Sequence, residues 1–343
     1  MSSAIVYRHD DPVGRFPILD VKPAVDNGRW PAKAFVGELI PFSATVFREG
    51  HDSLGVEVLL TSPTGKSTVT RMRAGAPGSD RWHTEKLLDE QGGWRFSVRA
   101  FADDFDTWHH NTEVKLAAGV DEELMMLEGI ALLTRAATDK DRTAANAKAL
   151  VAAAEILSDQ KLTPKHRFES ACSAALMKGI AAHPIRSFET LSEAFVINCE
   201  RTLAGRGAWY EFFPRSEGAK FDPKTQTWTS GTFKTATKRL PAVASMGFDV
   251  LYMPPIHPIG VAFRKGPNNT LKAVGQDPGS PWAIGSSAGG HDAIHPDLGT
   301  EKDFRAFVAA ANDLGIEIAM DLAVQASPDH PCLLYTSDAA DDS

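Results

Sequence analysis

Histidine and aspartate side chains gather in Gly- and Pro-rich stretches of the second half of the chain: His257, His291, Asp292, His295 and Asp297. These residue types can bind a metal ion, and a structural zinc site places its ligands at short, recognisable spacings. The spacing here matches no such pattern. The sequence therefore predicts no metal site, and nothing in it calls for a cofactor.

Three other polar residues stand where a ligand could be held. Lys265 lies in the stretch FRKGPNN (263–269), and a flexible ammonium group among Gly and Asn suits a phosphate or a sugar hydroxyl. An ordinary solvated loop cation is the alternative interpretation. Asp321 and Gln325 follow an apolar run at 316–320, so both could meet a ligand at the end of a strand. A polar residue satisfied at a strand end is the alternative for Gln325.

The elements that must position these residues alternate between strand and helix. Short apolar runs predict strands, a three- to four-residue apolar repeat predicts helices, and Thr300 with Asp303 forms a capping box. Pro241 should bend or interrupt the earlier helix, and Gly247 should end it. The expected order is a buried strand at 207–214, helix 233–244, strand 248–253, helix 300–314 and strand 316–322. Such alternation implies a parallel sheet with right-handed crossovers.

Four blocks of this region resemble the α-amylase superfamily and, within it, the α-1,4-glucan:maltose-1-phosphate maltosyltransferases. They are AWYEFFPRS (208–216), MPPIHPIG (253–260), GGHDAIHPDLGT (289–300) and DLAVQASPDHP (321–331). In the last block Gln325 and Ala326 stand where ordinary amylases have Asn and His, as in the maltosyltransferases. The resemblance implies the first three strands of a (β/α)₈ TIM barrel, truncated after the third.

The same resemblance implies a chemistry and assigns roles. Transfer with retention needs two carboxyl groups about 5 Å apart. In the family the nucleophilic Asp, the acid Glu and a stabilising Asp come from the fourth, fifth and seventh strands, which this chain does not reach. We therefore assign no catalytic residue and expect the chain alone to be inactive. Lys265 and Gln325 are expected to bind substrate, Asp321 to support its neighbours, and His291 and Asp292 to line or brace the sugar pocket.

The sequence before residue 205 predicts a different architecture. Residues 1–116 alternate short strands with turns and indicate an immunoglobulin-like β-sandwich; the strands are 39–47, 56–61, 67–73, 82–87 and 93–100.

Residues 117–190 then predict an inserted helical bundle, and residues 191–204 a return strand and linker to the barrel, which runs over 205–331. Asp121, Thr143 and Thr163 are the predicted caps of the bundle. The last is followed by a first-turn proline and opens a single helix that Pro184 bounds. In the resembled family, sandwich and insertion help to form a homodimer. Residues 332–343 match nothing in that family, and we interpret them as a foreign tail.

Composition narrows the possible functions. The formal net charge of −8 and pI near 5.8 argue against broad nucleic-acid binding. Three cysteines without disulfide or zinc spacing favour a reducing compartment, and the absence of an apolar N-terminal or membrane-spanning run favours the cytoplasm. α-Maltose 1-phosphate and α-1,4-glucan are the partners that the resemblance implies. A noncatalytic glucan-binding or assembly module, or another amylase-family hydrolase or branching enzyme, remains the alternative.

The truncation leads to one structural expectation. Three strands cannot close a barrel, so the inward faces of Val250, Tyr252, Ile318 and Met320 should be partly uncovered.

Overall fold

The computed structural model describes residues 14–274 and 277–338. The chain forms two compact units, Met1–Thr202 and Leu203–Ser343, and each is described by itself. Among the described residues, every helix is too short or too polar to cross a lipid bilayer.

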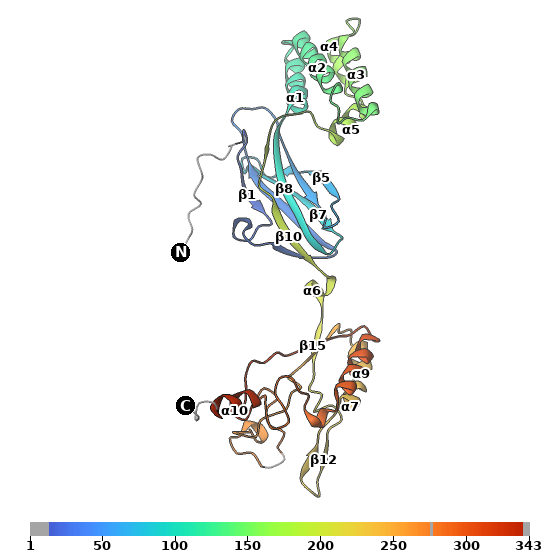
Figure 1. Cartoon of the computed structure of the whole chain (residues 1–343). Helices are drawn as coiled ribbons and strands as arrows, with labels where there is room; N and C mark the ends of the chain where they lie inside the picture. The colour runs from blue at the N-terminus through green and yellow to red at the C-terminus, as the bar shows by residue number, and fades with distance from the viewer. Residues whose placement is uncertain (1–13, 275–276, 339–343) are drawn as a thin grey trace. The chain divides into compact units, whose positions relative to one another are not determined.

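Two β-sheets form most of the first unit (Figure 1). The first has the order β1 (Ile18–Lys22), β3 (Glu38–Val46), β7 (Arg81–Leu88) and β6 (Arg73–Ala74). The second has the order β2 (Ala32–Phe35), β10 (Phe195–Glu200), β8 (Gly92–Asp103), β4 (Leu54–Thr61) and β5 (Ser67–Arg71), and β9 (Arg186–Leu191) also pairs with β8. Four of the five predicted strands and the return strand are confirmed, with ends shifted by up to three residues. The predicted strand 67–73 is divided into β5 and β6, which belong to different sheets. Strands β1, β2 and β9 were not predicted.

The two sheets share one hydrophobic core. Alternate side chains of β3 and β8 point inward, as a period of two requires. Phe42 of β3 and Phe96 of β8 meet edge to face with ring centroids 4.9 Å apart. Val56, Val58 and Val98 are fully buried beside them. The first unit is therefore a two-layer sheet structure, and the alternation in the sequence predicted the inward faces of β3 and β8.

Five helices follow β8 and gather beyond one end of the sheets (Figure 1). They are α1 (Asp104–Ala118), α2 (Glu122–Ala137), α3 (Ala144–Ser158), α4 (Pro164–Ala171) and α5 (Ala174–Ala182). The predicted caps Thr143 and Thr163 are confirmed, since each side chain accepts a bond from the backbone N–H three residues on. The prediction of a capping bond from Asp121 was wrong: its carboxylate forms an ion pair with Lys115 at 3.2 Å instead.

Two boundaries of the helical region differ from prediction. Helix α1 was not predicted, because its sequence carries little apolar periodicity; Asp103 caps it by accepting from the Asp106 backbone N–H. The single helix expected after Thr163 is two helices, and Ser173 caps the second.

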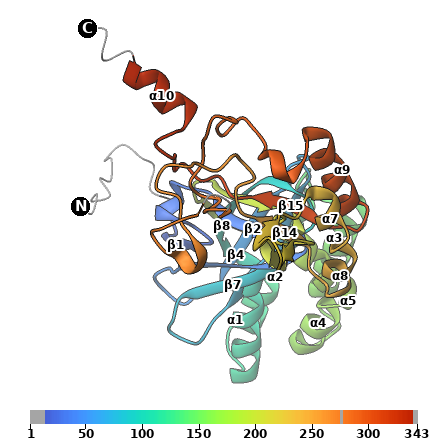
Figure 2. The same cartoon turned by 90° about the horizontal axis from the view of Figure 1, so that it is seen from below.

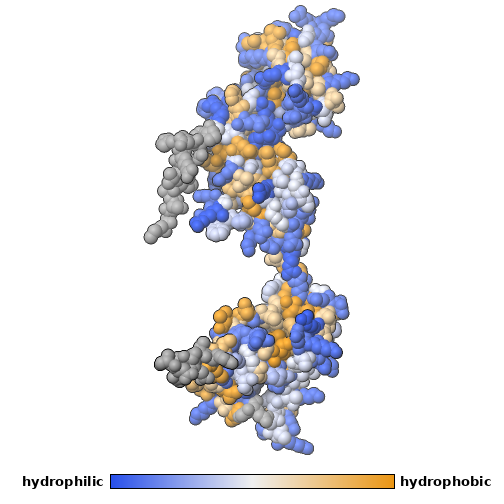
Figure 3. Space-filling view, in the orientation of Figure 1, coloured by the Kyte–Doolittle hydropathy of each residue, from blue (hydrophilic) through white to orange (hydrophobic). Residues whose placement is uncertain are grey.

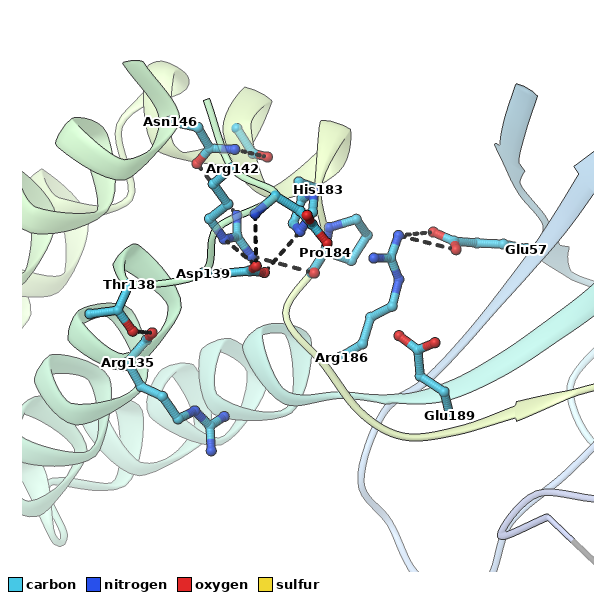
Figure 4. Close-up of polar contacts among 12 residues, drawn as sticks. Glu57, Arg135, Thr138, Asp139, Arg142, Asn146, His183, Pro184, Arg186 and Glu189 are labelled. Atoms are coloured by element: carbon cyan, nitrogen blue, oxygen red, sulfur yellow. Dashed lines mark hydrogen bonds and ion pairs between the residues drawn. The ribbon is translucent and has the colours of Figure 1, made fainter. Parts of the chain in front are cut away.

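A buried carboxylate ties the helical region to the sheets (Figure 4). Glu57 on β4 is 3% exposed and accepts bonds from Arg99 at 2.7 Å and from Arg186 at 3.1 Å. Arg186 opens β9, the strand that returns from the helices. Across this junction, Arg142 reaches the carbonyl of Pro184. The return of the chain is thus held by charged hydrogen bonds as well as by strand pairing.

The second unit contains a three-stranded parallel sheet with the order β11 (Trp209–Glu211), β14 (Val250–Met253) and β15 (Glu317–Met320). Helices α7 (Phe233–Thr237), α8 (Leu240–Ser245) and α9 (Glu301–Asn312) lie beside it (Figure 2). The remaining elements are a hairpin of β12 (Lys220–Asp222) and β13 (Thr227–Thr229), helices α6 (Thr202–Arg206) and α10 (Pro331–Asp338), and 3-10 turns at Asp26–Gly28, Pro267–Asn269 and Pro296–Leu298.

Local signals in this unit were confirmed. The Thr300–Asp303 capping box starts α9, and the expected helix before Gly247 is divided into α7 and α8 near Pro241. Phe233 and Phe307 are fully buried and pack with ring centroids 5.9 Å apart. The helices therefore cover the sheet through their predicted apolar faces.

Two predictions about exposure need correction. The strand at 207–214 was expected to be buried, but β11 is only three residues long and Trp209 is 57% exposed, because β11 is an edge strand. Val250 was expected to be uncovered but is buried, since β14 lies between two strands. Tyr252 is half-buried and Met320 is 46% exposed, as expected. Ile318 is half-buried for another reason: it pairs with Leu251 and packs against the core that the helices cover, so it does not share the face of Val250 and Tyr252.

The parallel sheet is open within the described residues, with no barrel closure. Apolar side chains reach the surface of this unit (Figure 3), and Leu322 and Val324, just after β15, are 81% and 89% exposed.

The last dozen residues fall partly outside the described region. Helix α10 covers the first part of the predicted tail 332–343, and residues 339–343 lie outside the described residues.

Candidate functional site

The carboxyl ends of β14 and β15 bring two of the sequence blocks together. Met253 and Met320 are register partners, so the loops that begin at Pro254 and Asp321 leave the sheet side by side. Ligands of open parallel sheets bind outside this end of the strands. The loops 254–300 and 321–331 therefore form the candidate functional site.

Asp321 is held directly at this end of the sheet. Trp282 Nε1 donates to its carboxylate at 2.6 Å. Partial burial and the neighbouring Asp321 carboxylate raise the pKa of Tyr252, because both disfavour a second negative charge. The carboxylate thus fixes an indole and keeps a phenol protonated. Its assignment as a supporting rather than a reacting group stays a prediction.

A chain of hydrogen bonds through two histidines joins the third and fourth blocks. His291 Nε2 lies 2.7 Å from the Ala323 carbonyl oxygen, which can only accept, so this nitrogen carries a proton. His330 Nδ1 accepts from the Cys332 backbone N–H, so His330 donates through Nε2 to His291 Nδ1 at 3.0 Å. One pair of neutral tautomers satisfies all three contacts. The loop that carries Gln325 is thereby fastened to the loop that carries His291.

Close packing of backbone and side chain accompanies this chain. A Cβ atom on Gly290 would lie 2.4 Å from His330 Nε2, and one on Gly260 would lie 1.9 Å from Ser327 Oγ. Neither position has room for a side chain. Asp329 accepts from the backbone N–H groups of residues 261 and 262. Burial acts to raise the pKa of Asp329, but the bonds from Ser327 and from these N–H groups outweigh it and lower the pKa.

Arg215, His295 and Asp297 form a second polar group near the site. Burial, together with the Arg215 guanidinium, lowers the pKa of His295 to about 4, against the opposing effect of Asp297. His295 Nδ1 accepts from the Asp297 backbone N–H at 3.1 Å, and Arg215 Nη2 lies 3.3 Å from Nε2. A neutral imidazole has one acceptor nitrogen, so only one of these donors is satisfied. The group favours an uncharged His295.

Lys265 and Gln325 both project from the loops of the site. Lys265 is half-buried, Gln325 is exposed, and neither side chain has a hydrogen bond or ion pair within the described part of the chain. The neighbour of Lys265 is fixed: Arg264 donates to the carbonyls of Ile259, Gly260 and Asp277 at 2.9–3.1 Å. The structure therefore offers two available polar side chains on anchored loops, and their role in binding stays a prediction.

The histidines considered as metal ligands are engaged in other contacts. His257 Nδ1 contacts the Ala293 carbonyl at 2.9 Å, and both nitrogens of His291 are hydrogen-bonded. Within residues 14–274 and 277–338 no group of three metal-ligating side chains could hold an ion. Asp292 contacts the Gly290 backbone N–H and does not join such a group.

Sequence reasoning missed three residues that shape the site: Trp282, Arg264 and His330. His330 lies inside a quoted block, so the block contained a signal. Trp282 and Arg264 act on residues 39 and up to 13 positions away, through contacts that no local pattern reveals.

Known proteins resemble nearly the whole chain. Residues 14–201 match the family model described as "Alpha-1,4-glucan:maltose-1-phosphate maltosyltransferase, domain N/S". "Alpha-1,4-glucan:maltose-1-phosphate maltosyltransferase 1" of Streptomyces coelicolor is 49% identical over 335 residues, covering 96% of this chain and 48% of that protein. The protein of the same name, without the number, from Mycobacterium tuberculosis is 42% identical over 344 residues, covering 93% and 48%. The chain thus spans about half the length of the curated relatives that it matches.

Proposed function

Because this chain belongs to the α-1,4-glucan:maltose-1-phosphate maltosyltransferase family, we propose that it is the amino-terminal part of an enzyme that transfers maltosyl units. The donor would be α-maltose 1-phosphate and the acceptor the non-reducing end of an α-1,4-glucan, with phosphate released and the anomeric configuration retained. The observation that carries this proposal is 49% identity over 96% of the chain.

The chemistry of the proposed reaction requires groups beyond this chain. A double displacement uses one carboxylate to attack the anomeric carbon and one carboxylic acid to protonate the leaving group. No residue of this chain takes either role in the proposal, and the 343-residue chain is expected to be inactive alone. Its contribution is the floor of the site, built by the loops after β14 and β15.

In this proposal Lys265 contacts the sugar phosphate and Gln325 hydrogen-bonds the disaccharide. Both side chains are available on loops anchored by Arg264 and by the His291–His330 pair. Ligand-detected NMR with α-maltose 1-phosphate should show weaker binding to the Lys265→Ala and Gln325→Ala variants. Lys272→Ala is the matched control, since Lys272 is an exposed lysine of the same loop. Equal loss in the control would contradict the assignment.

The test of the whole function begins with the gene. Sequencing its source DNA beyond the codon for Pro331 should reveal a continuing frame with a fourth strand bearing an Asp, which would identify residues 332–343 as foreign. The extended protein should then release phosphate from α-maltose 1-phosphate only when a maltooligosaccharide acceptor is present. A hydrolase or branching enzyme would act on the glucan without releasing phosphate, and that result would refute the proposal.

The finer architecture and assembly are part of the same proposal. The two facing sheets would be an immunoglobulin-like sandwich that receives the helices α1 to α5 as an insertion, and the parallel sheet (205–331) would be the start of a (β/α)₈ barrel. A homodimer would bury the exposed apolar residues of α2, of which Leu124 and Leu127 are 47% and 63% exposed. In the Leu127→Glu variant of the extended protein, sedimentation experiments should then find monomers in place of dimers.

A cytoplasmic location completes the proposal, supported by the free thiols of Cys172 and Cys199.

A further inference from the structure

A pocket of about 410 Å³ lies in the first unit where the sheets meet the helices. We call it the junction pocket. Its walls come from the segment after β3, from α1 and α2, and from Phe188 of β9. Its size falls within the range of small-molecule sites, and it lies in the other structural unit from the loops after β14 and β15.

The positive charges around the junction pocket are already compensated. Arg48 pairs with Asp52 at 2.8 Å, and Arg135 pairs with Asp104 at 2.7 Å. Arg15, the third guanidinium of the lining, pairs with a carboxylate outside it at 2.5 Å. Since each cation has its own carboxylate, the pocket offers no uncompensated positive charge to an anion. The Glu128 carboxylate of the lining has no cationic partner within the described residues, so a ligand that donates hydrogen bonds and carries no negative charge fits the pocket.

The aromatic ring at the rim is presented by a strained backbone. Phe188 has φ +53°, a conformation that a bulky residue rarely adopts, and its side chain is 71% exposed. The pairing of β8 with β9 is irregular at this point, between Ala100 and Ala102. Such irregularities re-aim side chains, and strained residues of this kind cluster at ligand sites. Burial cannot explain the conformation, because the ring it displays is mostly in solvent.

Hydrogen-bonding groups beside this ring are available to a ligand. Asn111 and Glu128 line the pocket, and neither has a polar partner within the described residues. Thr107 Oγ1 accepts from the Ser53 backbone N–H and keeps its own proton to donate. An exposed ring with an amide, a carboxylate and a hydroxyl around it matches the surface of a sugar, which has apolar ring faces and many hydroxyl groups.

We infer that the junction pocket binds a segment of α-1,4-glucan, apart from the site where transfer would occur, with Phe188 stacked on a sugar ring and with Asn111 and Glu128 hydrogen-bonded to hydroxyl groups. The identity of the glucan rests on the proposed function, whereas the hydroxyl-rich class of ligand rests on the pocket itself, because a sugar can donate from its hydroxyl groups to the unpaired Glu128 carboxylate and stack its ring on Phe188. Such a site would hold a growing glucan on the enzyme between transfers.

The test is an isothermal titration of the complete 343-residue chain with maltohexaose, in which calorimetry measures the dissociation constant. Phe188→Ala should weaken binding by about tenfold, the upper end of what one aromatic contact contributes. Phe188→Trp should retain binding, because the stacking surface is kept. The Lys272→Ala variant should bind as tightly as the unaltered chain, because Lys272 is an exposed lysine of the other unit and belongs to neither proposed site.

A fourth variant separates a binding role from a structural one. Phe188→Gly removes the ring and also relieves the positive φ, so it should abolish the stacking contact while the first unit stays as stable as before or becomes more stable. Loss of stability with loss of binding would instead show a structural role and overturn the inference.

Three other results would overturn the inference. They are the absence of maltohexaose binding, unchanged binding in Phe188→Ala, and a change of oligomeric state in Phe188→Ala that marks the pocket as an interface. None of these results would contradict the proposed transferase function, which is tested by phosphate release from the extended protein. Conversely, the absence of phosphate release would not contradict glucan binding in the junction pocket.

Discussion

Protonation of His295 should make the second unit acid-sensitive. Its side chain is 14% exposed and faces the Arg215 guanidinium, with Asp297 as the nearest carboxylate. Burial and Arg215 lower its pKa from 6.5 to about 4 in the folded chain. Between these two values the unfolded chain binds more protons than the folded one, so the free energy of unfolding falls as the pH falls.

The size of this effect follows from the two pKa values. One pKa unit corresponds to about 1.4 kcal/mol, so His295 removes about 3 kcal/mol of stability as the pH falls from above 6.5 to about 4. Below the folded-state value the loss is complete and no further change comes from this group. The loss is a large part of the stability of an ordinary domain.

His295→Asn is the matched variant. Asn cannot be protonated, and its side-chain oxygen can still accept the Asp297 backbone N–H, the contact that caps the 3-10 turn at Pro296–Leu298. Urea unfolding of both proteins between about pH 4 and pH 7, followed by hydrogen exchange in α9, reports on the second unit alone. The difference in free energy of unfolding between the unaltered chain and the variant should decrease by about 3 kcal/mol as the pH falls from about 7 to about 4.

Comparing the two proteins removes contributions from other titrating carboxylates. A difference that stays constant within about 0.5 kcal/mol across the range would refute the reasoning, because independent sites add to that accuracy. An NMR titration in which His295 keeps its usual pKa near 6.5 would refute it directly.

Three further changes test other contacts. Long-range proton–nitrogen NMR should find both His291 and His330 protonated on Nε2, and His330→Phe should cost about 1–3 kcal/mol by leaving His291 Nδ1 buried without a donor. Glu57→Ala should destabilise the first unit by roughly 3–5 kcal/mol in urea unfolding, because two guanidinium groups lose their carboxylate. Gly260→Ala should destabilise the second unit by roughly 1–3 kcal/mol, because the added methyl overlaps Ser327.

Matched controls exist for these variants. Glu189→Ala removes a half-exposed partner of Arg99 at 3.6 Å and should cost less than about 1 kcal/mol. Gly93→Ala adds a methyl to open space and should change stability by less than about 0.5 kcal/mol. Finding His330 protonated on Nδ1, or equal effects in a variant and its control, would contradict the corresponding contact.

Local interactions made much of the fold predictable. The Thr300–Asp303 capping box joins groups three residues apart, and Pro241 divides a helix through its own ring. Alternation along β3 and β8 identified their buried faces, because the side-chain period of a strand is fixed by backbone geometry. Four contiguous blocks were enough to identify the family. Each of these signals is complete within a few neighbouring residues.

Contacts between distant segments were decided only by the tertiary structure. Trp282 meets Asp321 across 39 residues, His291 meets His330 across the same separation, and Arg186 meets Glu57 across 129. Nothing in the neighbouring sequence of Phe188 indicates its positive φ, which depends on how β9 pairs with β8. Local sequence determined most of the elements and the family to which the chain belongs, whereas α1, β1, β2 and β9 were not apparent from it. Three-dimensional packing determined which side chains contact one another and which, such as Lys265, Gln325 and Phe188, remain available to a ligand.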